Sequence, residues 1–86
     1  MYFVYILTSL KETNRCYIGL TQNVEKRVKE HNTDRVNYTK KFVPWELHAY
    51  IALKSKTLAK NLEKYLKSGS GFAFLKKRFF ESLAKS

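Results

Sequence analysis

The first strand-like segment of this 86-residue chain is apolar at nearly every position, which limits the folds open to it. Residues 2–8 read YFVYILT, with β-branched and aromatic side chains at odd and even positions alike. Side chains on a strand alternate between the two faces of a sheet, so this strand needs a covering layer on each face. On folding, a chain of this length buries only about 60–65% of the surface that it exposes when unfolded. Both covering layers must therefore come from few helices or strands.

Two more strand-like segments follow along the chain. Residues 16–21 come after the polar, turn-like stretch 9–14, and we expect them to pair with the first strand as an antiparallel hairpin. Residues 46–53 alternate cleanly after Pro44. One face of this third strand is predicted to carry the aliphatic side chains of Leu47, Ala49, Ile51 and Leu53. The outward face is predicted to carry Glu46, His48 and Tyr50.

Helical periodicity accounts for the remaining segments. Asn23 is a favoured N-cap residue, and residues 24–31 then read as a helix. A second, amphipathic helix is indicated by the spacing of Leu58, Ala59, Leu62, Tyr65 and Leu66. A last helix follows a Gly/Ser turn at 68–71, with apolar positions at Phe72, Leu75, Phe79 and Leu83. The order β-β-α-β-α-α predicts one α+β domain over residues 1–86, a three-stranded antiparallel sheet flanked by helices.

Positive charge dominates the chain. Seventeen Lys or Arg residues against seven Asp or Glu residues give a net charge of +10, and the excess is largest after residue 53. Such a charge predicts an anionic partner, of which nucleic acid is the most common; the alternative is a basic protein without one. Two basic segments are candidate phosphate contacts. They are Lys40 and Lys41, in a loop that alternatively is merely solvated, and Lys76, Lys77 and Arg78 in the last helix.

Several classes of protein are disfavoured. The single cysteine, Cys16, cannot form an internal disulfide, which is typical of a reducing cytoplasm. The chain opens on Met1 without a basic leader, and its apolar runs are shorter than the roughly 20 residues that span a bilayer. We therefore expect a cytoplasmic protein. No zinc-ligand spacing, P-loop or helix-turn-helix motif occurs, so the sequence gives no sign of base-specific recognition.

Two tyrosine-bearing tripeptides lie on the first two predicted strands, Phe3-Val4-Tyr5 and Tyr17-Ile18-Gly19. Arg27 and His31 follow on the edge of the first helix's apolar stripe, and Glu63 lies on the second helix. Neither tripeptide is specific alone, but the order and spacing of the whole set resemble the GIY-YIG nuclease family. The likeness covers residues 2–78 and is greatest to small stand-alone bacterial members, related to the N-terminal nuclease domain of an excinuclease. It implies the same α+β fold.

The resemblance also implies an activity: divalent-metal-dependent hydrolysis of DNA with little sequence preference, in repair or processing. It assigns Tyr17 to activate water with help from Tyr5, Arg27 to bind the scissile phosphate, and Glu63 to bind Mg²⁺ or Mn²⁺. His31 would serve in proton transfer or phosphate contact. A tyrosine is an unusual base because its free pKa is near 10, but positive charge from Arg27 or a cation favours the phenolate. One carboxylate suffices for Mg²⁺, which keeps several waters and takes other ligands from phosphate.

Each of these residues also has an ordinary structural interpretation. Strand tyrosines are usually packing aromatics, the two residues of the first helix would form a solvated edge, and Glu63 would pair with Lys60 or Lys67. Trp45 is interpreted as a packing anchor, with a base-stacking platform as the alternative. At the level of function, the first alternative is a non-catalytic nucleic-acid-binding or adaptor module on the same fold. The second is a protein-interaction domain whose charge is incidental.

Overall fold

The computed structural model describes residues 1–12, 14–33 and 38–81. Three strands form one antiparallel sheet in the order β2-β1-β3. The central strand β1 (Tyr2–Ser9) pairs with β2 (Cys16–Thr21) on one side and with β3 (Trp45–Leu53) on the other. The predicted hairpin and the predicted third strand are both confirmed.

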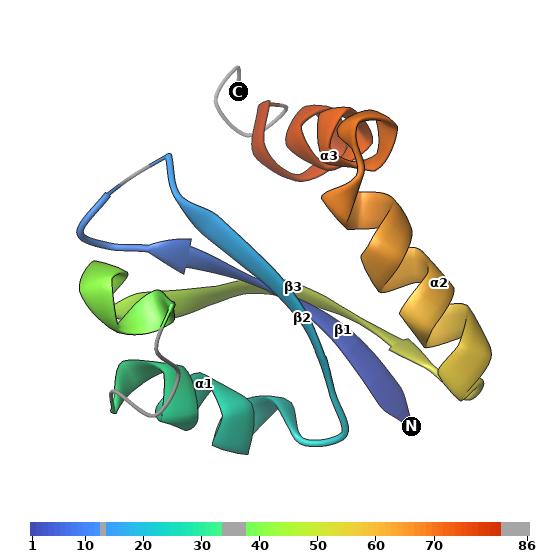
Figure 1. Ribbon diagram of the computed structural model, residues 1–86, viewed down its shortest axis with the longest axis horizontal. Helices are drawn as coiled ribbons and strands as arrows, with labels where there is room; N and C mark the ends of the chain where they lie inside the picture. The colour runs from blue at the N-terminus through green and yellow to red at the C-terminus, as the bar shows by residue number, and fades with distance from the viewer. Residues whose placement is uncertain (13, 34–37, 82–86) are drawn as a thin grey trace.

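Helices cover both faces of this sheet (Figure 1). Helix α1 (Val24–Asn32) packs on one face, and α2 (Lys56–Lys67) and α3 (Gly69–Leu75) pack on the other. A short 3-10 turn, η1 (Thr39–Phe42), precedes β3, and a π-helical turn, η2 (Lys76–Glu81), continues α3. The predicted α+β order β-β-α-β-α-α is confirmed.

The two-sided pattern of the first segment corresponds to two hydrophobic cores. Val4 and Ile6 point toward α2 and α3, where they join Ile18, Ala59, Leu66 and Leu75. Tyr5 and Leu7 point the other way, toward α1, and pack with Trp45. All four β1 side chains are at most 1% exposed. The central strand is therefore buried on both faces, as its sequence requires.

Short polar side chains set where the helices begin. Asn23 Oδ1 accepts a hydrogen bond of 3.0 Å from the backbone N–H of Lys26, which confirms the predicted cap of α1. Ser68 ends α2 and also caps α3, since its Oγ accepts from the N–H of Gly71. The predicted Gly/Ser turn over 68–71 is wrong in extent, because Ser68 alone separates the helices. A Cβ at Gly71 would collide with the backbone carbonyl of Tyr65, so this glycine permits the tight junction.

A bulge in β3 interrupts the predicted alternation. Ile6 of β1 pairs with Ala49, whereas Leu7 pairs with Leu47, so His48 is an extra residue on β3. Leu47 therefore lies opposite Leu7, on the α1 side of the sheet, and not with Ala49 as predicted. Past a bulge, every residue of the strand lies on the opposite face of the sheet from the one that simple alternation predicts. The sequence pattern of apolar residues does not reveal this change.

Four other predictions of side-chain exposure are wrong. His48 does not point outward: its Nε2 donates to the carbonyl oxygen of Phe79 at 2.8 Å, and its ring stacks on Phe80 at 4.3 Å. Leu58 and Tyr65 are 58% and 45% exposed, although both fit the apolar stripe predicted for α2. Phe72 is 38% exposed, since Gly71 and Leu75 form the buried side of α3.

Some predictions concern residues that the structure does not describe. Thr13 in the first turn, Asn37 in the basic loop and Leu83 in the last helix lie outside the described ranges. Within those ranges, no helix has the length and apolar character needed to cross a membrane.

Candidate active site

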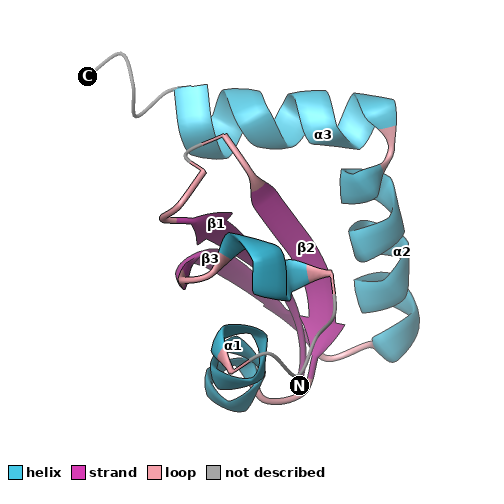
Figure 2. Cartoon of the chain, turned by 60° about the vertical axis from the view of Figure 1, so that its left-hand side comes forward, coloured by secondary structure: helices cyan, strands magenta, loops and turns pink. Residues whose placement is uncertain are grey.

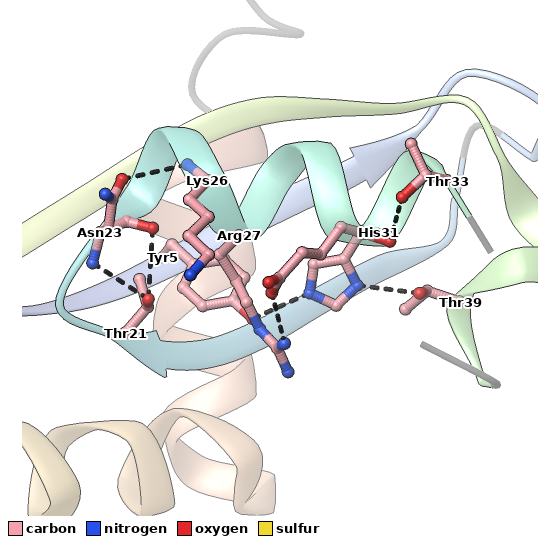
Figure 3. A network of polar contacts seen from close by, with 9 residues as sticks. Tyr5, Thr21, Asn23, Lys26, Arg27, His31, Thr33 and Thr39 are labelled. Carbon is pink, nitrogen blue, oxygen red and sulfur yellow. Dashed lines mark hydrogen bonds and ion pairs between the residues drawn. The ribbon is translucent and has the colours of Figure 1, made fainter. Parts of the chain in front are cut away.

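Tyr5 is the centre of a buried polar network between β1 and α1 (Figure 3). Its phenolic oxygen lies 2.9 Å from His31 Nε2 and accepts a hydrogen bond of 3.3 Å from Arg27 Nε. Gly19 pairs with Tyr5 across the sheet, and a Cβ at Gly19 would collide with the Tyr5 hydroxyl. The glycine of the second tripeptide therefore lets the phenol lie across β2 and reach α1.

His31 is fully buried and hydrogen-bonded through both ring nitrogens. Its Nδ1 lies 2.8 Å from Thr39 Oγ1. Burial lowers the pKa of His31 to about 4, and the charge of Arg27 acts in the same direction, so the ring is neutral at physiological pH. Burial also raises the pKa of Tyr5, although the Arg27 hydrogen bond opposes the rise. We therefore assign the Tyr5 O–H as donor to Nε2, which leaves Nδ1–H to donate to Thr39.

Trp45 holds this network in place from β3. Its indole N–H donates to the backbone carbonyl of Thr39 at 2.8 Å. Its own backbone exchanges two hydrogen bonds with the side chain of Asn32, of 2.6 and 3.0 Å. These contacts fix η1 and the end of α1 against the sheet. Trp45 is 3% exposed, so its interpretation as a packing anchor is confirmed.

Tyr17 lies at the edge of the buried network and faces solvent. Its ring centroid is 4.8 Å from that of His31 and 6.2 Å from that of Tyr5. Its side chain lines an open hollow whose other walls include Arg15, Tyr38, Lys67 and Phe72. Of the two strand tyrosines, Tyr5 is buried and Tyr17 is the one that water and a substrate can reach.

Arg27 is bound to Tyr5 and to its own helix. Its Nη1 lies 2.9 Å from Glu30 Oε1, and this hydrogen bond is the main cause that raises the pKa of Arg27. The side chain is about one-third exposed and lines a shallow hollow at the start of α1. The sequence predicted that the charge of Arg27 or of a bound cation favours the Tyr17 phenolate, whereas the hydrogen bond of Arg27 is made to Tyr5.

Glu63 approaches the same region from α2. Its Oε2 lies 3.1 Å from Lys67 Nζ, so the ordinary pairing with Lys67 is observed. The same Lys67 ammonium lies 5.9 Å from the centroid of the Tyr17 ring. The charge of Glu63 also contributes to the raised pKa of Tyr5, after burial. Glu63 and Tyr17 line separate hollows, and Lys67 lines both. Lys67 therefore connects Glu63 to Tyr17, although the sequence predicted it only as an alternative ion-pair partner of Glu63.

The donor set for a metal ion is small. Among residues 1–12, 14–33 and 38–81, no group of three or more His, Cys, Asp or Glu side chains could hold a metal ion. Mg²⁺ nevertheless needs few protein ligands, because it retains several waters and binds substrate phosphate. The Glu63 carboxylate is about one-quarter exposed, and its partner Lys67 is about half exposed. Such a pair contributes only about 0–1 kcal/mol, so Glu63 fits a metal that enters with the substrate.

The predicted phosphate contacts are exposed but differently placed. Lys40 and Lys41 lie on η1, directly after the Thr39 that contacts His31. Lys76 lines a second hollow, beside Phe72, whereas Lys77 and Arg78 are not among the residues that line it. Thr39 and Glu30 were missed as site residues. Glu30 could have been found from its spacing of three residues from Arg27 on one helix.

Comparison with known proteins identifies the class to which this fold and this cluster belong. A family model described as the GIY-YIG catalytic domain matches residues 1–77. The chain therefore belongs to the GIY-YIG family, which implies phosphodiesterase chemistry of the nuclease type on a nucleic-acid substrate, generally with a divalent metal. The chain is also similar to a UPF0213 protein of the archaeon Natronomonas pharaonis, with 38% identity over 68 residues, 78% of each chain.

Proposed function

We propose that this chain is a divalent-metal-dependent endonuclease that hydrolyses DNA with little sequence preference, as a single cytoplasmic domain acting in DNA repair or processing. Family membership supports the reaction class, and the net charge of +10 supports a polyanionic substrate. One observation carries the residue roles. The ring of Tyr17 packs on the buried network of Tyr5 and His31, while its side chain opens to a solvent-filled hollow.

Tyr17 is the proposed general base. Its phenolate oxygen takes a proton from a water molecule whose oxygen attacks the phosphorus atom. A new P–O bond forms as the P–O bond to the leaving sugar oxygen breaks, and that oxygen takes a proton from solvent. The guanidinium of Arg27 binds the non-bridging oxygens with the N–H groups that Tyr5 and Glu30 do not use.

His31 is proposed as a positioning residue. A fully buried ring cannot touch a phosphate, which leaves its role in the hydrogen bonds that it makes. By hydrogen-bonding to the Tyr5 hydroxyl, His31 fixes the position of the oxygen that accepts a hydrogen bond from Arg27 Nε. Tyr5 thus assists through Arg27 and through its ring contact with Tyr17.

Glu63 is the proposed ligand of Mg²⁺ or Mn²⁺. The bound ion would neutralise charge on the phosphate and on the leaving oxygen. For this, the Lys67 ammonium must leave Glu63, and a substrate phosphate entering beside Tyr17 offers it a new anionic partner. Further phosphate contacts are proposed for the exposed residues Lys40, Lys41, Lys76, Lys77 and Arg78.

One assay tests this function. Purified protein is incubated with single-stranded, duplex, flapped and branched DNA in the presence of Mg²⁺, Mn²⁺ or EDTA. We expect metal-dependent cleavage that Tyr17→Phe lowers by a factor on the order of 10² or more, because the ring remains and only the base is lost. Glu63→Gln should also abolish cleavage. Both variants should retain binding of DNA.

Matched variants control for contamination and for general effects of substitution. Tyr50→Phe changes an exposed tyrosine on β3, and Glu25→Gln changes an exposed carboxylate on α1; both should cleave like the wild type. Equal cleavage by the wild type and Tyr17→Phe would show that another group is the base.

A non-catalytic nucleic-acid-binding module is the second candidate. It is supported by the state of the two groups without substrate: Glu63 pairs with Lys67 and Arg27 pairs with Glu30, and a binding module would need neither pair to open. Wild-type protein that binds every DNA form and cuts none with any metal would establish this second function.

A further inference from the structure

The hollow that Tyr17 lines continues into a second one at the end of the sheet. The two hollows share four lining residues: Asn14, Arg15, Cys16 and Phe72. Beyond them, the second hollow is walled by residues that include Lys76 and Phe80. Figure 2 shows α3 running across the end of the sheet, beside the connection between β1 and β2. The residues that line the second hollow come from this connection, from the adjoining ends of β1 and β2, and from α3 and η2.

Phe72 is an aromatic ring exposed in this hollow without serving the core. It is 38% exposed, and the buried side of α3 consists of Gly71 and Leu75. The ammonium of Lys76 lies 5.9 Å from the centroid of the Phe72 ring. The ammonium lies over the ring, so it must move to the ring edge for a base to stack on that face. An aromatic side chain beside a mobile cation is the arrangement on which proteins stack the bases of single-stranded nucleic acid.

The cations around Phe72 can exchange their present partners for phosphate. Arg15 lines both hollows. Its guanidinium lies over the ring of Phe42, 4.3 Å from the centroid, and this contact leaves N–H groups at the guanidinium edge for an anion. Its acidic partner is Glu12, at 3.6 Å. Both side chains of that pair are about half exposed, so the pair contributes about 0–1 kcal/mol at most. Arg15 precedes Tyr17 by two residues on extended chain, about 7 Å at the usual rise per residue. A phosphate on Arg15 therefore lies close to the proposed scissile position.

We propose that Phe72, Arg15 and Lys76 form a subsite for one unpaired nucleotide next to the scissile phosphate. Phe72 stacks on the base, while Arg15 and Lys76 bind the flanking phosphates. The base must be unpaired because a base in a duplex has both faces covered by its neighbours, so no face is open to the ring. The substrate class is therefore DNA with a single-stranded segment at the cleavage site, such as a flap or an overhang. This inference rests on the proposed function for the place of cleavage and on the hollow for the binding.

Binding in EDTA tests the subsite independently of cleavage. Fluorescence anisotropy is measured with a blunt duplex and with the same duplex carrying a single-stranded extension. Phe72→Leu should weaken binding of the extended DNA by about tenfold or more while leaving the blunt duplex unchanged, because one stacked base is lost. Phe72→Tyr, which keeps an aromatic face, should restore binding.

Phe74 provides the matched control. It is 44% exposed two positions along the same helix, it contacts Tyr65, and it lines neither hollow, so Phe74→Leu should bind both DNAs normally. Equal losses on both DNAs in Phe72→Leu, or no loss on either, would overturn the subsite and leave the nuclease proposal intact. Selective loss of the extended DNA in a protein that cuts nothing would support the subsite and overturn the nuclease proposal.

Discussion

At the scale of single residues, the environment of His31 has a measurable consequence for stability. Its folded pKa of about 4 lies below the ordinary value of 6.5. Between about pH 4 and pH 6.5 this histidine is therefore mostly protonated in the unfolded chain and mostly neutral in the folded protein. The contribution of His31 to stability is complete above the unfolded value and is lost as the pH falls from about 6.5 to about 4. The difference between these two pKa values corresponds to a loss of about 3 kcal/mol. Solvent does not screen the effect, because the ring is fully buried.

We therefore predict that His31→Gln removes this part of the acid sensitivity. The amide can hydrogen-bond to Tyr5 and Thr39 but does not titrate. Urea unfolding at several pH values should show the wild type losing stability relative to the variant as the pH falls through this window. Carboxylates that titrate in the same range affect both proteins equally and cancel in the comparison. A difference in stability that stays constant with pH would contradict the buried, neutral assignment of His31.

At the scale of elements, the junction between α2 and α3 places the proposed subsite. Gly71 packs directly against the last turn of α2, and a Cβ there would collide with the Tyr65 carbonyl. Gly69, one helical position after the cap, has no atom within 4 Å of the place where its Cβ would be. Close packing therefore requires a glycine at position 71, whereas no neighbouring atom requires one at position 69.

The prediction is a contrast between two equal substitutions. Gly71→Ala should destabilise the fold by about 1–3 kcal/mol, because the helices must separate to admit the methyl group. Gly69→Ala should be neutral or stabilise by up to about 1 kcal/mol, since alanine favours a helix more than glycine does. Thermal unfolding of the two variants measures this difference. Equal effects would show that the junction yields easily.

The same scale explains what could be predicted from the sequence. The burial of β1 on both faces and the start of α1 at Asn23 follow from local patterns, because neighbouring residues alone determine them. The bulge at His48 does not follow from a local pattern, and the partners of its side chain, Phe79 and Phe80, are distant in sequence. Thr39 was missed as a partner of His31 for the same reason: Trp45 brings η1 back onto α1.

At the scale of the whole molecule, the net charge of +10 attracts any polyanion, and the question is whether the charge is also localised. Lys76 lies beside Phe72 in the second hollow, and Lys77 and Arg78 follow on η2. If these three residues contact phosphates, each contact releases counterions from DNA and steepens the dependence of binding on salt. General attraction would instead depend on the net charge alone.

Two triple variants with the same net charge separate these cases. Replacing Lys76, Lys77 and Arg78 by Gln should weaken binding to every DNA sequence and reduce the slope of log K against log salt by about 0.9 for each phosphate that is no longer bound. Replacing Lys29, Lys54 and Lys56 by Gln removes equal charge from exposed positions that line neither hollow, and should leave the slope nearly unchanged. Anisotropy titrations over a range of salt concentrations give both slopes.

Equal reductions would mean that binding follows the total charge, and unchanged slopes in both would place the phosphate contacts on another face. A larger reduction for the η2 variant would place the path of the DNA strand over α3 and η2, leading into the hollow that Phe72 and Tyr17 both line.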